Sequence, residues 1–273
     1  MKIYMKDYLS FEDMIEQFKF EAVQEDGTNY IYIENPSEKL QLSLLSRSKN
    51  WFDKIQNPSE AVQLAAIVGS GYSSVSIFSS IQNPSEAVQL AALNEGGFVI
   101  QLMPNATDQM KLIAVKANGS TIRFIQNPTE EMQLAAIAEN GMALQWIQNP
   151  TEEMQLAALT RCGSAIQFVE NPTEEMQLAA ITQNFYAIQY IQNPTEVVQL
   201  KSIENGADIA SIKNPTEATC WKALKRNSDC FKYIKNATEA MEIYAIKDNI
   251  KNIIFARSQA AKDLFKKMWD EIQ

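Results

Sequence analysis

A regular alternation of apolar and polar positions with a period of 22 residues runs through most of the chain. The ten residues NPTEEMQLAA occur three times unchanged, at 127–136, 149–158 and 171–180. The spacing between units is 22 residues except for one interval of 26 and one of 21. A fixed period of this length predicts a stack of small structural units. An Asn opens ten such units, namely Asn35, Asn57, Asn83, Asn105, Asn127, Asn149, Asn171, Asn193, Asn214 and Asn236.

The first half of each unit predicts an α-helix. In the unit that opens at Asn127, the Asn suits the N-cap, Pro128 the first helical position, and Glu130 a position from which it reaches back to the cap. Asn149 and Asn171 take the same structural role in the next two units. The apolar residues that follow cover much of the helix circumference, so neighbouring units must cover this helix on several sides. The helix is expected to end near Gly141, as a left-handed glycine would stop it.

The second half of each unit, such as Ala143–Ile147, has room for one or two helical turns. We expect a short α- or 3-10 helix there, with a strand as the alternative, because leucine-rich repeats have similar periods. The chain is therefore predicted to be an all-α solenoid of about ten units, each one α-helix plus a short α/3-10 helix. Atypical helical caps are expected at both ends, within one continuous domain: 1–30 as N-terminal cap, 31–250 as repeat solenoid and 251–273 as C-terminal capping helix.

Each end of the array carries a recognisable helix signal. Ser10–Asp13 forms a capping box pattern before an apolar helix. Near the other end, an amphipathic helix places its apolar side chains on one side, and a dimerisation helix is the alternative to a cap. The apolar residues of these two helices are Met14, Ile15 and Phe18, and Leu264, Phe265, Met268 and Ile272.

A glutamine interrupts the apolar run of most units, as Gln133, Gln155 and Gln177 show. The helical period places this amide on the packed side of the helix, where a buried polar group must be hydrogen-bonded. The amide can bond the next amide of the stack or a backbone group of the turn. We interpret the row as structural, with a polar binding groove as the alternative.

A row of aromatic residues is the strongest candidate for a binding site. Three residues before the Asn of four successive units stand Phe124, Trp146, Phe168 and Tyr190, beside Arg123, Gln145, Gln167 and Gln189. Aromatic residues and Arg are enriched in protein interfaces, which predicts a binding strip. Lateral packing between neighbouring repeats is the competing interpretation. The insertion Gly69–Ser74, which contains Tyr72, predicts a loop on one face that either binds or is silent.

The composition excludes several kinds of chemistry. The chain has no His, and its three Cys, Cys162, Cys220 and Cys230, lack metal-ligand spacing, so no metal, no cofactor and no catalytic residues are predicted. Reduced thiols and the absence of a signal peptide or an apolar 18-residue run favour a cytoplasmic location without membrane association. The net charge is −9, and residues 1–200 hold 11 basic and 23 acidic residues. This acidity disfavours direct nucleic-acid binding and permits a basic partner, although solubility alone also explains it.

The Asn-Pro-Thr-Glu opening, the Met132–Ile137 run and the Asn140-Gly141 turn together resemble an uncharacterised repeat family with NPTEE-type units. That family is encountered in phages, giant-virus-like genomes and intracellular bacteria, and the resemblance covers roughly residues 30–250. The short helical unit is also similar to leucine-rich-repeat-variant solenoids, in which a helix alternates with a 3-10 turn. The resemblance implies an interaction scaffold, in its most specific form a viral protein in the host cytoplasm that inhibits a host defence protein. It carries no catalytic residues over to this chain.

Three classes of function follow from these patterns. The favoured one is a non-enzymatic repeat scaffold that binds a protein, with a homodimer through the C-terminal helix as an additional option. The alternatives are an acidic decoy that occupies a host nucleic-acid-binding site and a protein that sequesters a small-molecule signal. An enzyme is disfavoured, because the sequence has no nucleophile–base pair, no P-loop and no dinucleotide-binding turn.

Overall fold

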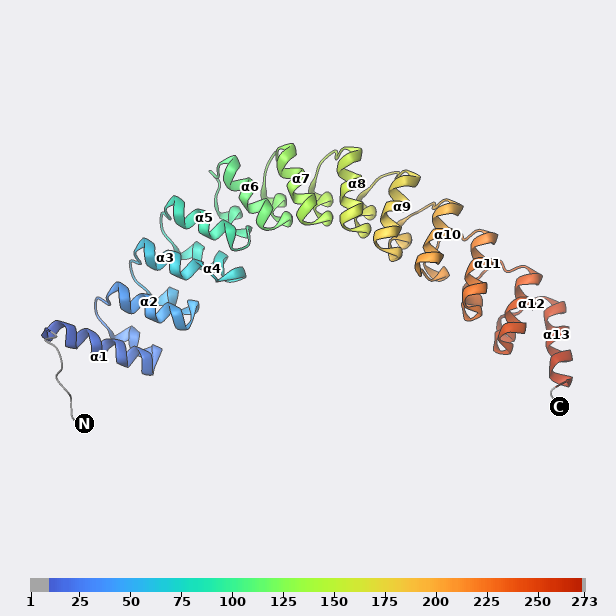
Figure 1. Cartoon of the computed structure of the whole chain (residues 1–273), viewed down its shortest axis with the longest axis horizontal. Coiled ribbons are helices and arrows are strands. Elements are labelled where there is room, and N and C mark those ends of the chain that lie inside the picture. The colour runs from blue at the N-terminus through green and yellow to red at the C-terminus, as the bar shows by residue number, and fades with distance from the viewer. Residues whose placement is uncertain (1–9, 272–273) are drawn as a thin grey trace. The chain divides into compact units, whose positions relative to one another are not determined.

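The computed structural model describes residues 10–271, and every regular element within them is a helix (Figure 1). α-Helices of about 22-residue spacing alternate with short helices that are almost all of the 3-10 type, as the sequence predicts. The chain divides into two compact units, Met1–Ala135 and Ala136–Gln273, and the division falls inside α7 (Glu130–Glu139). One continuous domain therefore stays a prediction.

The first unit stacks its α-helices in chain order, with α1 on α2, α2 on α3, α3 on α5 and α5 on α6. The insertion forms η3 and α4, and α4 lies on the side of the short helices, where it contacts η2 and η4. Its elements are α1 (Phe11–Glu25), η1 (Gly27–Tyr32), α2 (Glu38–Arg47), η2 (Lys49–Lys54), α3 (Glu60–Ile67), η3 (Gly71–Ser73), α4 (Ser74–Ser80), α5 (Glu86–Asn94), η4 (Phe98–Leu102), α6 (Asp108–Ala117) and η5 (Gly119–Phe124).

The second unit stacks α8 to α13 in one layer and its 3-10 helices in a second layer (Figure 1). Its core consists of the packed faces between these helices, where residues such as Leu159, Ile181 and Ile188 are fully buried. Burying a side chain of this size stabilises the fold by about 1.5–3 kcal/mol. The elements are η6 (Gly141–Trp146), α8 (Glu152–Arg161), η7 (Gly163–Phe168), α9 (Glu174–Gln183), η8 (Phe185–Tyr190), α10 (Glu196–Asn205), η9 (Ile209–Ser211), α11 (Glu217–Arg226), η10 (Ser228–Tyr233), α12 (Glu239–Asp248), η11 (Ile250–Phe255) and α13 (Gln259–Asp270).

The start of each α-helix differs from the prediction by two residues. Thr151, and not Asn149, is the N-cap of α8, because its side chain accepts a hydrogen bond from the backbone N–H of Met154. Asn149 instead adopts a left-handed backbone with φ of 51°. The residue before a proline avoids the right-handed helical conformation, and Asn tolerates the left-handed one better than most residues. Asn127 and Asn171 do the same, each with φ of 50°.

The acidic residue of each unit is therefore the first residue of its α-helix and not the third. There it lies at the positive end of the helix dipole. It also links neighbouring units, because the hydroxyl of Ser59 donates to Glu38 (2.5 Å) and that of Thr195 donates to Glu174 (2.5 Å). The pair Ser85 to Glu60 repeats this contact, and Ser37 donates to Glu16, which lies inside α1 and not at its start. The acid of one unit thus accepts a hydrogen bond from the N-cap hydroxyl of the next.

Gly141 and Gly163 have a steric role, and the expectation of a left-handed C-cap at Gly141 is wrong. Gly141 and Gly163 are the first residues of η6 and η7 and do not have a positive φ. A Cβ at Gly163 would lie 2.2 Å from the carbonyl oxygen of Ala180 in the next α-helix. A Cβ at Gly141 would lie 2.5 Å from the carbonyl oxygen of Ala158. Glycine is thus required because two units approach closely.

The two ends of the described chain differ. The capping box of Ser10 and Asp13 at the start of α1 is confirmed. Yet α1 exposes an apolar stripe that includes Phe11 and Phe18, so it does not present the polar outer face of a typical cap. In α13 only Ala261 is buried, and Leu264, Phe265 and Met268 are half-buried. Ile272, the fourth apolar residue expected there, lies outside the described residues.

Replacing Gly163 with Ala should lower the free energy of unfolding by about 1–3 kcal/mol, because the new methyl group overlaps the Ala180 carbonyl. Gly96→Ala is the matched control, because a Cβ there meets no atom within 4 Å. Urea unfolding followed by circular dichroism measures both. Equal stability of the two variants would show that the units do not need this close approach.

Candidate functional site

The short helices present a repeated pattern of buried and outward side chains. A 3-10 helix has three residues per turn, so its first and fourth residues share one side and its second and fifth share another. In η7, Gly163, Ala165 and Ile166 are buried, whereas Gln167 is exposed and Phe168 is half-buried. The second, fifth and sixth residues of each six-residue short helix therefore form its outer surface. We call this surface the 3-10 face.

The predicted aromatic row lies at the last residue of successive short helices. In the second unit, Trp146, Phe168 and Tyr190 end η6, η7 and η8, and these three helices pack on one another in order. Trp146 and Phe168 are half-buried, and Tyr190 is 39% exposed. These side chains are thus neither fully buried nor, in the case of Trp146 and Phe168, fully exposed. Their burial does not separate the two interpretations, and the binding strip stays a prediction.

The glutamines beside the row are exposed and serve their own helices. The side-chain amide of Gln145 donates to the carbonyl of Met142 (3.1 Å), and that of Gln167 donates to the carbonyl of Ser164 (3.0 Å). Gln189 is exposed at the same place in η8. These amides leave their carbonyl oxygens at the surface beside the rings, a pairing of polar and aromatic groups typical of interfaces.

In the first unit, Tyr72, Phe124 and Arg123 form one cluster around Phe98. The ring of Phe98 lies 6.4 Å from that of Tyr72 and 6.4 Å from that of Phe124. The guanidinium of Arg123 lies 5.7 Å from the centroid of Phe98 and 4.7 Å from that of Phe124. The structure therefore joins the insertion to the aromatic row. Phe98 is not predicted from the sequence to join this cluster, although it precedes Asn105 by seven residues, as Ser164, the outward second residue of η7, precedes Asn171.

The insertion that carries Tyr72 is held by Glu95. The carboxylate of Glu95 accepts hydrogen bonds from the backbone N–H groups of Gly69 (2.9 Å) and Gly71 (3.1 Å). Both glycines have positive φ, which residues with a side chain rarely adopt. The loop thus has a defined shape, and it holds Tyr72 at the surface with 86% of the residue exposed.

Charge is distributed unevenly between the two sides of the repeats. From η4 to η8, the five short helices contain one charged residue, Arg123. The α-helices over the same stretch begin with acidic residues such as Glu130, Glu152 and Glu174. Low charge combined with aromatic residues, Met and Arg is the composition that distinguishes the centre of a protein interface.

The glutamine row belongs to the scaffold in the structure. The Nε2 of Gln155 donates to the carbonyl of Pro150 (3.1 Å) in the turn of its own unit. Gln133 bonds Pro128 (3.1 Å) and Gln177 bonds Pro172 (3.0 Å) in the same way. The glutamines therefore bond the turn, one of the two options derived from the sequence. Gln199 also reaches the next unit, where its Oε1 accepts from the N–H of Thr216 (2.9 Å).

A carboxylate replaces this amide in α12. Glu242 is 3% exposed and accepts from the backbone N–H groups of Arg257 (3.1 Å) and Ser258 (2.7 Å), where α13 begins. Burial alone would raise the pKa of Glu242, but the hydrogen bonds from Ser258 and Arg257 and the nearby Arg257 charge together hold that pKa below its ordinary 4.5. Glu242 thus links α12 to the start of α13, as Gln199 links its own unit to the next.

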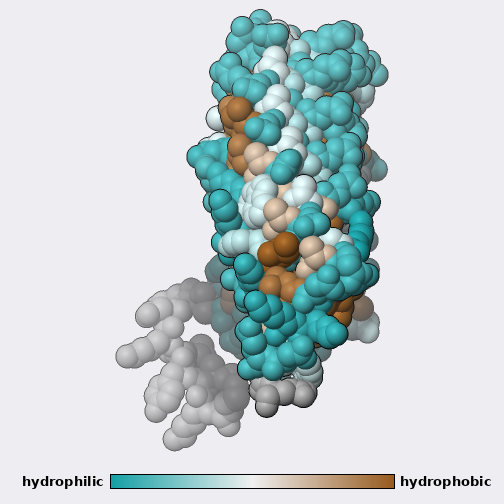
Figure 2. Space-filling model, turned by 90° about the vertical axis from the view of Figure 1, so that its right-hand side faces the viewer, coloured by the Kyte–Doolittle hydropathy of each residue, from teal (hydrophilic) through white to brown (hydrophobic). Residues whose placement is uncertain are grey.

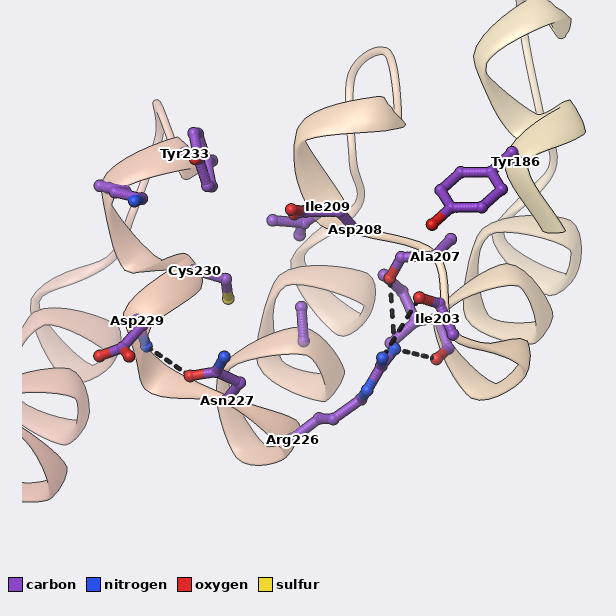
Figure 3. A pocket seen from close by; sticks show the side chains of 13 residues that line it. Tyr186, Ile203, Ala207, Asp208, Ile209, Arg226, Asn227, Asp229, Cys230 and Tyr233 are labelled. Carbon is purple, nitrogen blue, oxygen red and sulfur yellow. Dashed lines mark hydrogen bonds between the residues drawn. The ribbon is translucent and has the colours of Figure 1, made fainter.

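A hollow of about 410 Å³ opens in the second unit where the repeat is irregular (Figure 3). There α10 ends at a left-handed Gly206, and η9 has three residues where η8 has six. Ser211 ends η9 at the position that holds Tyr190 in η8, so the aromatic row is interrupted. Tyr186, Asp208, Cys230 and Tyr233 are among the residues that line the hollow.

The outer side of the α-helices is a weaker candidate for a binding site than the 3-10 face. A shallow groove of about 720 Å³ between α8 and α9 is lined by Leu156, Leu178 and their neighbours, with Glu174 and Glu175 also in its lining. Figure 2 shows one face of the molecule on which hydrophobic residues form separate small patches among hydrophilic ones. Scattered apolar side chains of this kind are normal for a protein surface.

Within residues 10–271, no group of three or more His, Cys, Asp or Glu side chains could hold a metal ion. In the same part of the chain, no helix is both long enough and apolar enough to cross a membrane. Comparison with protein-family models, with curated proteins and with solved structures gives no match. The function must therefore be argued from the surface itself.

Glu242→Gln should cost about 1–3 kcal/mol of unfolding free energy at pH 7, because an amide has one acceptor oxygen for two backbone donors. The pKa of Glu242 is lowered in the folded state, so its contribution is present above the ordinary 4.5 and is lost as the pH falls through the lowered value. The difference in unfolding free energy between the wild type and Glu242→Gln should therefore become smaller in acid. Urea unfolding at pH 7 and pH 3 measures this, with Glu239→Gln, exposed on the same helix, as control. A gap that is constant with pH would contradict this role of the carboxylate.

Proposed function

We propose that the chain is a non-enzymatic repeat scaffold that binds a protein through its 3-10 face. One observation carries the proposal: in the second unit, Trp146, Phe168 and Tyr190 end the successive short helices η6, η7 and η8, which contain no charged residue. Surfaces of this composition occur at the centres of protein interfaces, where a few aromatic and Arg residues supply most of the binding energy.

The geometry of the rings favours binding in a second way. Trp146 and Phe168 are half-buried against neighbouring repeats, so their orientation is largely fixed before a partner arrives. Immobilising a free side chain on binding costs about 0.5–1.5 kcal/mol, and a ring that is already packed avoids much of that cost. The remaining exposed edge is available to the partner.

The repeat also explains how such a surface is built without a catalytic centre. Each short helix offers its second, fifth and sixth residues to the surface, while the buried positions maintain the stack. Substitution at the outward positions therefore changes binding without disturbing the core. This arrangement supports a long contact surface better than a single constellation of reacting groups.

The acidity of the chain supports a competing proposal, an acidic decoy for a nucleic-acid-binding site. Many of its acidic residues lie at the starts of the α-helices, where three of them, Glu38, Glu60 and Glu174, accept hydrogen bonds from the next N-cap hydroxyl. Exposed charges are screened by salt, whereas contacts of buried rings are much less affected. A decoy would therefore lose its partner in high salt, and an aromatic interface would retain it.

Replacing Trp146 and Phe168 together with Ala should reduce capture of the partner at least about tenfold, since truncating an interface hot spot typically costs 2 kcal/mol or more. The tagged chain is used to capture proteins from the cells in which it occurs naturally, and each captured protein is quantified by mass spectrometry at 0.1 M and 0.5 M salt.

The matched control is Leu156→Ala with Leu178→Ala, two half-buried residues on the outer side of the α-helices. Circular dichroism and urea unfolding establish that both double variants are folded. Equal loss in the two variants, or no loss in either, would overturn the assignment of the 3-10 face. Capture that disappears in 0.5 M salt with the aromatic residues intact would favour the acidic decoy.

A further inference from the structure

We propose that the hollow beside η9 receives a lysine or arginine side chain of the protein partner. This inference rests on the proposed function, because it names a group that the partner presents to the 3-10 face. The hollow lies on that face between η8 and η10, where the shortened η9 leaves a gap in the row of outward side chains (Figure 3).

The size of the hollow suits a single long side chain. Its volume of about 410 Å³ lies within the range of about 300–1,000 Å³ that is typical of binding pockets. The apolar part of its lining includes Ile203, Ala207 and Ile209, all buried. Such a lining can cover the aliphatic stem of a lysine or arginine, as these side chains commonly bury their stems.

Two tyrosines stand on opposite sides of the hollow. Tyr186 extends from η8 and Tyr233 from η10, and both are exposed (Figure 3). The face of an aromatic ring attracts a cation. The ammonium of Lys232 already lies 4.9 Å from the centroid of Tyr233, so one of these rings holds a cation within the chain itself.

The acidic side chains of the lining are Asp208, at the start of η9, and Asp229, in η10. Asp208 uses one carboxylate oxygen to accept from the N–H of Ala210 (3.1 Å). Burial raises the pKa of the nearby Cys230 thiol to about 11, with the Asp208 carboxylate adding to that increase and Arg226 opposing it. Burial disfavours a charge of either sign, so the attraction for a cation comes from the Asp208 carboxylate and the faces of the tyrosine rings.

The basic side chains of the lining are Arg226 and Lys232. Arg226 is occupied, because its guanidinium donates to the carbonyls of Ile203 (2.7 Å), Gly206 (3.2 Å) and Ala207 (3.2 Å). Arg161 donates to the carbonyls of Ala138 and Glu139 in the same manner, so this contact belongs to the scaffold. Lys232 is exposed and flexible, and an incoming cation can use the Tyr186 face or displace it from Tyr233.

The net charge of the chain does not itself favour a cation here, because the acidic excess lies in residues 1–200, whereas residues 201–273 hold 13 basic and 10 acidic residues. The attraction must therefore come from the lining of the hollow. Asp208 and the two tyrosines are the groups that would select one basic side chain of the partner. Carboxylate and aromatic groups together bind guanidinium and ammonium better than either does alone.

A fluorescein-labelled peptide of Gly and Ser with three Arg residues is the probe, and the same peptide with citrulline in place of Arg is its neutral isostere. Fluorescence polarisation at 0.1 M salt gives the dissociation constants. We expect the Arg peptide to bind and the citrulline peptide to bind at least about tenfold more weakly. Equal binding of the two peptides, or no binding of the Arg peptide by the wild-type chain, would overturn the proposal.

Three variants of the lining and one control variant locate the binding site. Asp208→Asn preserves the cap of η9, because Asn also accepts a backbone hydrogen bond, and it should weaken binding at least about fivefold. Tyr186→Ala should have a similar effect, whereas Lys232→Ala should strengthen binding because it removes a competing cation. Glu170→Gln removes the same charge at an exposed position outside the hollow and should change binding less than about twofold.

Equal weakening by Asp208→Asn and Glu170→Gln would show general attraction to an acidic chain and would overturn the assignment of the hollow. The result is separable from the capture experiment, because Trp146 and Phe168 do not line the hollow. Capture that fails to depend on those two residues overturns the proposed contact face. Peptide binding that fails to depend on Asp208 overturns only the proposal that the hollow receives a basic side chain.

Discussion

The structure depends on the packing of each α-helix against the neighbouring α-helices of the stack. Most of these helices have about ten residues, a length that is marginal for an isolated helix in water. Neighbouring helices bury the apolar side chains, and their contact also satisfies the polar groups at the turns. The N-cap hydroxyl of Ser59 donates to Glu38 of the preceding unit, and Gln155 donates to its own turn. The same contacts, repeated along the chain, fix both the spacing and the register of the units.

This packing restricts some positions of individual units more than others. Gly163 has no room for a side chain because the Ala180 carbonyl lies against it. Phe168, on the outward side of the same short helix, is replaced by Trp146 and Tyr190 in the neighbouring units. Variation at this position alters the surface and leaves the stack intact. The candidate binding surface therefore occupies the side of the repeat that the core does not constrain.

Irregular units add features that a uniform repeat would lack. The insertion brings Tyr72 to Phe98 and Phe124, and Glu95 holds its backbone in place. The short η9 opens a hollow between two tyrosines. Both features lie on the side of the short helices, because the layer of α-helices must remain continuous for the units to stack. We infer that specificity resides in these departures from the 22-residue pattern.

The sequence by itself determined the all-helical repeat, its period, the order of its two helices and the capping box at Ser10, because these depend on local preference and on periodic apolar positions. It also placed Phe124, Trp146, Phe168 and Tyr190 in equivalent positions. Only the tertiary structure decided that Thr151 caps its helix while Asn149 turns left-handed, since Asn and Thr are both favoured N-cap residues. The steric role of Gly163, the partners of Arg123 and the hollow at η9 likewise depend on atoms of neighbouring units. Distances between units are set by packing, which a residue pattern does not encode directly.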